Sequence, residues 1–215
     1  MARTPYIKKE KPPFPYERPL SYSQLSTFKW RKQDWYEKYV IHQNCTRELC
    51  ALGEDDCPVV RTSPEMIFGS MVDKKIQEDP TYLPQVPRLK HLQYPLRVDF
   101  NGIPLVGYPD NLDLDNPHLR DTKTGKKKWD KKRADETDQL TMYLFQIYLI
   151  HKIHPEKFEC AIDWLPTHIK DGEVALIDET DIVVIKTKRS MTDILRFGNK
   201  IIETRKAMEE YYNAQ

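Results

Sequence analysis

The chain has 215 residues, of which 31% are charged, and its formal net charge is +1 at pH 7. This length suits one domain with a substantial core and leaves little room for two large domains. A net charge so close to zero excludes a general polycation, so any affinity for nucleic acid must come from local clusters of basic residues.

The sequence favours a cytoplasmic protein without membrane association. It contains no run of about 18 uncharged apolar residues, and its basic, proline-rich beginning lacks an apolar signal core. Three cysteines, Cys45, Cys50 and Cys57, lie close together and Cys160 lies far away, which is unlike the dense disulfide framework of a small secreted protein. We therefore expect a reducing environment.

The first part of the chain predicts an arm followed by an aromatic helix. Residues 1–20 are rich in proline and lysine, so we expect an extended arm outside the core, and residues 21–215 as a single domain. From Ser23, which we expect to cap the helix, bulky side chains recur on one helical stripe between Leu25 and Val40. This helix should pack on the domain.

A second helix is expected over residues 63–77, after a loop that contains the three early cysteines. Gly69 would allow a neighbouring element to approach closely, although a helix also tolerates a glycine without any such reason. The side chains expected to face inward are Met66, Ile67, Met71, Val72 and Ile76.

Strand signals begin after a proline-rich, irregular connection at residues 80–95. The stretch LRVDFNGIPLVGYPD predicts two strands joined by an Asn101-Gly102 turn, with Asp110 at the end of the second, and NLDLD and HLRDTKT continue the pattern. The strongest helical periodicity of the chain then covers residues 135–153.

The last third predicts more strands and a final helix. KFECAIDWLP, EVALIDE and DIVVIKT have strand composition, and the last two are a plausible hairpin. Ser190 and Asp193 form a variant of the capping box before a helix that extends to about Tyr211. This order of elements predicts the α/β class, with a central mixed β-sheet flanked by helices.

Acidic side chains at two neighbouring strand ends suggest a metal site. Asp110 and Asp121 would place two carboxylates where a divalent cation can bridge them, and oxygen ligands suit Mg²⁺ or Mn²⁺. The carbonyl of Thr122 could add a ligand, and Lys123, on the same strand face as Asp121, could orient a water or stabilise phosphate charge. The alternative is a surface turn with a strand-end ion pair.

The residues Gly107-x-x-Asp110, Asp121-x-Lys123-Thr124-Gly125 and Gln139-x-x-x-Tyr143 together resemble the PD-(D/E)XK nuclease superfamily, specifically its RecB-like exonuclease branch, which includes CRISPR-adaptation nucleases. PLSYSQLSTFKWRKQDWYEKYV is similar to the opening helix of that branch, and FGSMVDKKI to its Gly-x-x-x-His helix. The resemblance implies a restriction-endonuclease-like core and phosphodiester hydrolysis. It also implies a metal ligand at Asp73, where the branch has a histidine.

The cysteines depart from the iron-sulfur pattern of some members of that branch. Those members hold the cluster by one cysteine near the first helix and three beyond the last conserved helix, whereas here three lie early and one late. The early cysteines also lack the common spacing of zinc ligands. We therefore expect no iron-sulfur cluster, and loop thiols are the simpler interpretation.

Gln139 and Tyr143 lie one helical turn apart and share a face, so both could reach the catalytic strands or a substrate phosphate. Tyr143 could equally be a core aromatic residue. Asp73 could simply face solvent.

A basic run follows the proposed catalytic lysine and suits a DNA backbone, with Trp129 as a stacking contact. A solvated loop is the alternative. The candidate DNA-binding residues are Lys126, Lys127, Lys128, Trp129, Lys131, Lys132 and Arg133.

The sequence therefore predicts a divalent-metal-dependent DNA nuclease, in the first place an exonuclease, that acts in replication, recombination or repair. Asp110, Asp121, Lys123, Gln139 and Tyr143 would be the catalytic residues. Two alternatives remain: a catalytically silent DNA-binding subunit of a complex with a replication or recombination protein, and a structural or mediator protein without phosphate chemistry. Strand preference and oligomeric state are not predicted.

Overall fold

The computed structural model describes residues 13–41, 63–178 and 182–215. Cys45, Cys50 and Cys57 and the beginning of the predicted arm lie outside these ranges. Within the described ranges, every helix is too short or too polar to cross a bilayer.

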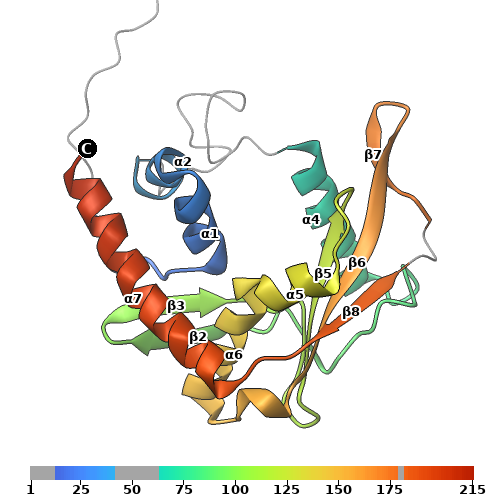
Figure 1. The fold of residues 1–215 in the computed structure, drawn as a ribbon. Coiled ribbons are helices and arrows are strands. Elements are labelled where there is room, and N and C mark those ends of the chain that lie inside the picture. Colours follow the sequence, from blue (N-terminus) through green and yellow to red (C-terminus); the bar gives the residue numbers. More distant parts are fainter. Residues whose placement is uncertain (1–12, 42–62, 179–181) are drawn as a thin grey trace, which may run out of the picture.

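A six-stranded mixed sheet forms the centre of the fold (Figure 1), which confirms the predicted α/β class. Its strands run in the order β1-β4-β5-β6-β7, and β8 also pairs with β6. Only the β5–β6 pair is parallel among the strand pairs of this sheet in the described ranges. The strands are β1 (His91–Leu92), β4 (Asn111–Asp113), β5 (His118–Gly125), β6 (Glu159–Lys170), β7 (Glu173–Leu176) and β8 (Val183–Thr187).

The predicted hairpin between the last two strands is wrong, because β7 and β8 both pair with the long strand β6. The hairpin instead joins β6 to β7. Asp171 and Gly172 at its turn have positive φ angles of 52° and 85°, the backbone that two-residue hairpin loops with Asp-Gly adopt. The Asp171-Gly172 pair is therefore the local feature that indicates a hairpin between β6 and β7.

Two α-helices and a short 3-10 helix (Pro155–Lys157) connect the parallel strands, because parallel pairing requires a crossover connection. The α-helices are α5 (Lys131–Glu136) and α6 (Asp138–His151). The prediction of one helix over residues 135–153 is therefore wrong at its beginning, where the chain breaks between α5 and α6. Thr137 separates them and caps α6, with its hydroxyl accepting a hydrogen bond from the Gln139 N–H at 3.4 Å. The break reorients the chain directly before Gln139.

The Asn101-Gly102 hairpin is confirmed, but it forms a two-stranded sheet of its own from β2 (Leu96–Phe100) and β3 (Ile103–Gly107). This hairpin packs against α6. Leu20 extends it: the Leu20 N–H donates to the Pro104 carbonyl at 2.7 Å, and the Leu20 carbonyl accepts from Val106 N–H at 3.0 Å. Residues 13–20 thus end at the edge of the hairpin.

The expectation that residues up to Leu20 lie outside the core is wrong for its described part. Leu20 is fully buried and Phe14 nearly so, and both belong to the main hydrophobic cluster. Phe14 contacts Tyr212 near the end of the chain, with ring centroids 5.3 Å apart. Apolar side chains in a proline-rich segment can therefore still join a core without forming regular structure.

The aromatic first helix is divided into α1 (Tyr22–Trp30), α2 (Lys32–Tyr36) and a π-helical turn (Glu37–Ile41). Ser21, not Ser23, caps α1, and its hydroxyl accepts from the Gln24 N–H. The predicted aromatic stripe is buried, and Phe28 packs edge-on against Trp35 at 5.1 Å.

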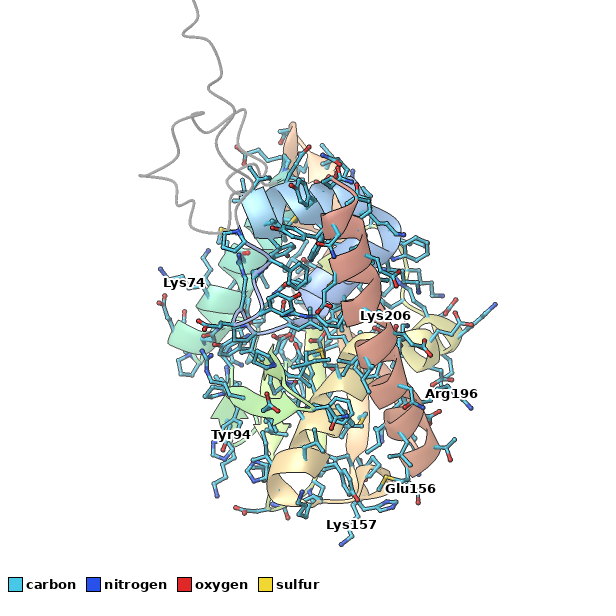
Figure 2. The ribbon with its side chains drawn as sticks, turned by 90° about the vertical axis from the view of Figure 1, so that its left-hand side faces the viewer. Lys74, Tyr94, Glu156, Lys157, Arg196 and Lys206 are labelled. Atoms are coloured by element: carbon cyan, nitrogen blue, oxygen red, sulfur yellow. The ribbon has the colours of Figure 1, made fainter. Side chains whose placement is uncertain are left out.

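The last helix, α7 (Met191–Asn213), begins with the predicted capping box of Ser190 and Asp193 and continues two residues past Tyr211. It packs against α6 and α1. Its outward side is charged: Figure 2 shows Arg196 and Lys206 on the surface of this helix.

Helix α4 (Pro64–Glu78) has the predicted Ser63 cap, but only Val72 and Ile76 of the five residues expected to face inward are buried. Met66, Ile67 and Met71 are exposed, because α4 lies at the side of the domain, where β5 and β7 are its main neighbours among the described helices and strands. Figure 1 shows α4 on one side of β5 and the pair α1 and α7 on the other. The end of β5 lies between these helices.

Gly107, at the end of β3, allows the hairpin to lie directly against α6. A Cβ atom at this position would come within 2.4 Å of Gln146 Oε1 and 2.9 Å of the Tyr143 ring. Gln146 is itself fixed, because its amide donates to the Leu96 carbonyl at 3.2 Å. The glycine of the Gly-x-x-Asp pattern is therefore a packing requirement.

We predict that Gly107→Ala lowers the free energy of unfolding by about 1–3 kcal/mol, the usual cost of overpacking a fixed site. Chemical denaturation monitored by circular dichroism measures this loss. Gly69→Ala is the matched control: its Cβ would meet only the Thr124 hydroxyl, at 2.9 Å, which can rotate, and alanine favours the helix. Equal losses for the two variants would contradict the packing argument.

Candidate active site

Asp121 is the centre of the candidate site and is completely buried on β5. Its Oδ1 accepts a hydrogen bond from Gln139 Nε2 at 2.9 Å. Its Oδ2 lies 2.5 Å from the Lys123 ammonium, an ion pair without the geometry of a well-directed hydrogen bond. The predicted pairing of Asp121 with Lys123 on one strand face is therefore present.

Asp110 lies beside Asp121, although neither acid ends a strand as predicted: Asp121 lies in the middle of β5, which continues to Gly125. Strand β3 ends at Gly107, and Asp110 occupies the bend directly before β4. Because β4 runs antiparallel to β5, Asp110 reaches the Thr122 N–H, which donates to its Oδ2 at 2.7 Å. Thr122 thus holds Asp110 through its N–H, and a ligand role for the Thr122 carbonyl stays a prediction.

Burial and mutual repulsion make the two carboxyl groups difficult to ionise. Burial, followed by the charge of Asp121, raises the pKa of Asp110 to about 8, against the opposing effect of Lys123. Burial also raises the pKa of Asp121, and Lys123 again opposes the shift. For Lys123, burial favours the neutral amine, but Asp121 and Asp110 outweigh it and raise its pKa. Two acids and one ammonium therefore share a poorly solvated site.

Gln93 is a site residue that the sequence did not indicate. Its side-chain nitrogen donates to Asp110 Oδ1 at 2.8 Å and lies 3.3 Å from Asp73 Oδ2. Gln93 has a positive φ of 49° and belongs to the irregular connection before β2, where no periodicity marked it. The predicted residue Asp73 is thus linked to Asp110 through one amide group.

Gln139 and Tyr143 lie as predicted on one face of α6, toward β5. Gln139 Nε2 donates to Tyr143 Oη at 2.9 Å as well as to Asp121, and the Tyr143 hydroxyl donates to the Tyr108 carbonyl at 3.1 Å. Tyr143 is 5% exposed, and burial raises its pKa, so the hydroxyl keeps its proton. Tyr143 is therefore both a core residue and a support for Gln139.

The donor atoms are carboxylate oxygens, which suit Mg²⁺ or Mn²⁺ better than softer cations that prefer nitrogen or sulfur ligands. Two buried carboxylates repel each other, and Asp121 Oδ2 lacks a hydrogen bond, which is what a Mg²⁺ or Mn²⁺ ion would relieve. Asp73 is near enough for its charge to raise the pKa of both acids. Among the described residues, however, no three acidic, histidine or cysteine side chains are grouped closely enough to form a ready-made metal site.

The predicted basic run divides into an exposed loop and a paired helix. Lys126, Lys127 and Lys128 are exposed, whereas Lys131 and Lys132 on α5 pair with acids four residues ahead. The Arg133 side chain folds back and donates to the Lys127 carbonyl at 3.1 Å. The loop lysines are thus the more available group.

Trp129 is 9% exposed and belongs to the hydrophobic core, which differs from the solvent-facing ring that its predicted stacking role requires. The Arg133 guanidinium covers the ring, 3.9 Å from its centroid. A base could stack on Trp129 only if Arg133 moved away.

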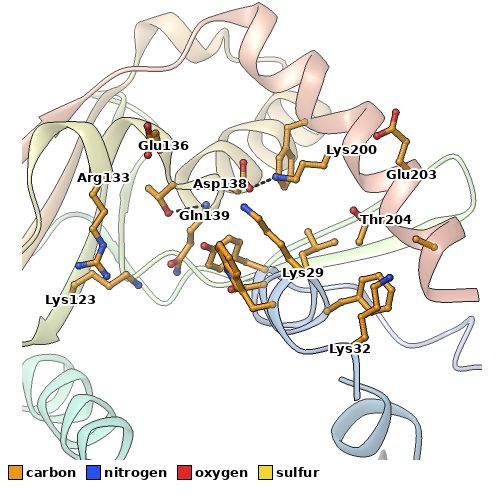
Figure 3. Close-up of a pocket in the computed structure, with 18 of the residues that line it drawn as sticks. Lys29, Lys32, Lys123, Arg133, Glu136, Asp138, Gln139, Lys200, Glu203 and Thr204 are labelled. Atoms are coloured by element: carbon orange, nitrogen blue, oxygen red, sulfur yellow. Dashed lines mark hydrogen bonds and ion pairs between the residues drawn. The ribbon is translucent and has the colours of Figure 1, made fainter. Parts of the chain in front are cut away.

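A pocket of about 990 Å³ opens beside the carboxylates. Lys123 and Gln139 line it from the site, α1 and α7 form its other walls, and Figure 3 shows Lys29 extending across it toward α6. A second pocket of about 390 Å³ lies against α4, and Lys123 and Asp73 line it. Lys123 therefore borders both pockets.

Comparisons with known proteins bear on the fold. No family model matches the sequence, and no curated protein matches it. A crystal structure from Eubacterium rectale, described as a "Putative exonuclease", is similar with a TM-score of 0.56 and 12% sequence identity, over 94% of this chain and 85% of that chain. The two chains share a fold. At 12% identity, the activity of this chain must be argued from its own residues.

We predict that Asp110→Asn stabilises the metal-free protein increasingly as pH rises from about 5 to about 8. The folded pKa of about 8 lies above the ordinary value of 3.8, so the folded state holds a proton that the unfolded state has lost. Wild-type stability therefore falls by up to about 1.4 kcal/mol for each pH unit across this window, and the amide removes that fall. Thermal unfolding in chelator at several pH values measures it.

Asp113→Asn is the control for that series. The pKa of Asp113 is lowered, mainly by the hydrogen bond from the Asn116 N–H, so its shift is opposite to that of Asp110. Asp113→Asn should therefore not gain stability at high pH. Parallel pH curves for wild type and Asp110→Asn would show that Asp110 is not destabilised by its surroundings.

Proposed function

We propose that this chain is a divalent-metal-dependent deoxyribonuclease of the RecB-like branch of the PD-(D/E)XK superfamily. The observation that carries the proposal is the buried carboxylate Asp121, in contact with Lys123 two residues ahead and beside Asp110. Burying two like charges is costly, and a purely structural site would gain more from apolar side chains. The fold shared with the Eubacterium rectale protein is consistent with this proposal.

Asp110 and Asp121 would hold one or two Mg²⁺ or Mn²⁺ ions, with Asp73 and the Thr122 carbonyl as further candidate ligands. Such a cation polarises a scissile phosphate and lowers the pKa of an attacking water. Gln93 bridges Asp73 and Asp110, so its amide would have to move or turn its oxygen inward when a cation arrives.

The remaining residues orient the reacting groups. The Lys123 side chain is 27% exposed, and its ammonium could both position a water and offset charge that develops on the phosphate. Gln139 fixes the Asp121 carboxylate through Oδ1, and Tyr143 fixes Gln139 in turn. DNA phosphates would contact the exposed lysines at positions 126–128. Exonuclease action at a DNA end, in replication, recombination or repair, is the specific form that we propose.

A silent DNA-binding subunit is the second candidate function. One observation favours it: the Gln93 amide nitrogen lies between Asp73 and Asp110, where it satisfies both carboxylates without a cation. A replication or recombination protein would then supply the chemistry. Metal-dependent cleavage by the purified chain separates the two candidates.

We predict that Asp121→Asn abolishes Mg²⁺- or Mn²⁺-dependent cleavage of end-labelled DNA while the protein stays folded. The amide keeps the shape and the Gln139 contact but loses the charge that a cation needs. Lys123→Ala should lower the cleavage rate about a hundredfold, the usual effect of removing one preorganised electrostatic group.

Asp113→Asn is again the matched control, because Asp113 lies at the other end of β4, opposite His118. This variant should cleave DNA like the wild-type protein. If the wild-type protein binds DNA but cleaves no single-stranded, duplex or branched substrate with either metal, the silent-subunit proposal replaces the nuclease proposal.

For the loop we predict that replacing Lys126, Lys127 and Lys128 together by alanine weakens DNA binding similarly for all sequences. Phosphate contacts carry no base information, and each one lost should reduce the slope of log affinity against log salt by about one. Titrations at several salt concentrations measure the slope. A slope equal to that of wild type would identify the loop as solvated surface only.

A further inference from the structure

The larger pocket has an apolar floor and basic walls. Leu25 and Phe28 of α1, both less than 10% exposed, contribute apolar surface. Lys29 and Lys32 contribute ammonium groups from the α1–α2 side, and Lys200 contributes one from α7. Figure 3 shows Lys123 and Arg133 at one end of the pocket and Lys32 at the other. Positive charge therefore extends from the candidate site along the pocket.

The acids of this pocket are largely neutralised by neighbouring lysines. Asp138 pairs with Lys200, and Glu136 lies 3.9 Å from Lys132. Glu203 on α7 is the remaining acid among the described lining residues. Lys200 and Lys123 are themselves paired, with Asp138 and Asp121, so the surplus of positive charge comes from Lys29, Lys32 and Arg133. This surplus suits an anionic ligand that lies along the pocket.

Trp30 adds an aromatic surface at the same pocket. It is 74% exposed, whereas Trp35, Trp129 and Trp164 are each less than 10% exposed. The Lys29 ammonium lies 4.9 Å from the centre of its ring. A large exposed indole beside lysines is the combination with which proteins bind unpaired bases and the phosphates that join them.

We infer that this pocket binds a single strand of a polynucleotide, with an unpaired base on Trp30 and phosphates at Lys29 and Lys32; the inference rests on the proposed function. A volume of about 990 Å³ is at the upper end of the range of about 300–1,000 Å³ for small-molecule sites, which has room for part of one strand but not for a double helix. Within a duplex, moreover, base faces are covered by neighbouring bases.

The position of Lys123 gives the strand a path across the candidate site. Lys123 borders the larger pocket on one side and the smaller pocket against α4 on the other. A phosphate at Lys123 would therefore have room for chain on both sides. The strand enters past Trp30 and meets the carboxylates at β5.

Fluorescence anisotropy in chelator tests the inference, because binding is then measured without cleavage. The probes are a labelled DNA strand, the RNA strand of the same sequence and the blunt DNA duplex. We expect wild type to bind a single strand more tightly than the duplex, and Trp30→Ala to lose about tenfold or more of that affinity. Trp30→Phe should retain most of it, and Lys29→Ala should lose severalfold.

Lys206→Ala is the matched control, because Lys206 projects from the outer side of α7 and does not line the pocket (Figure 2). It should bind like wild type, and thermal unfolding should show that all variants are folded. RNA binding with the same dependence on Trp30 supports the inference and identifies RNA as an occupant. Unchanged affinity in Trp30→Ala, or equally tight duplex binding, overturns it.

Failure of the inference and failure of the proposed function give different results. A protein that cleaves duplex DNA with metal, unaffected by Trp30→Ala, is a nuclease whose pocket does not hold a single strand. A protein that binds single strands through Trp30 but cleaves nothing retains the pocket and loses the nuclease. A protein that shows neither binding nor cleavage overturns both the inference and the proposed function.

Discussion

Burial of the Asp121 carboxylate is the constraint on which the arrangement of this domain depends. A fully buried charge must be paired and hydrogen-bonded, because the desolvation cost is otherwise several kcal/mol. Lys123 supplies the opposite charge from the same strand, and Gln139 supplies a hydrogen bond from α6. The helix and the strand are therefore fixed relative to each other by a polar contact as well as by apolar packing. Asp110 joins them through the Thr122 N–H, which brings the beginning of β4 to the same place.

A second polar centre fixes the beginning of α6. Arg189, 4% exposed, donates to the carbonyls of Ala134 and Thr137 and to the hydroxyl of Thr141, so one side chain from the segment before α7 holds the break between α5 and α6. This break determines where α6 begins, and therefore the position of Gln139 in its first turn. The orientation of the catalytic candidates thus depends on a residue that lies far from them in the sequence, and a change at Arg189 would act on the site through the backbone.

The features that sequence predicted and those that it missed differ in how local their causes are. The Asn101-Gly102 turn and the Ser190 cap depend on the backbone preferences of the residues themselves, and both were correct. The two acids were expected to meet because strand ends are neighbours, whereas they meet through the antiparallel register of β4 and β5. The helix break at Thr137 depends on contacts with Arg189, 52 residues ahead, and no periodicity reveals it. Gln93 became a site residue only because an irregular segment passes Asp110, so its position could not be read from any repeat.

The parallel pairing of β5 with β6 also determines when the site can form during folding. Residues 126–158 separate the two strands, so this pairing requires closure of a long connection before its contacts contribute, which slows folding. Asp121 lies opposite Ile162 in that pairing and under α6, so its carboxylate leaves water only when these distant parts assemble. We therefore expect the energetic cost of the acidic pair to fall on a late, non-local step of folding. In the metal-free chain, the electrostatics of the site would then slow folding as well as lower equilibrium stability.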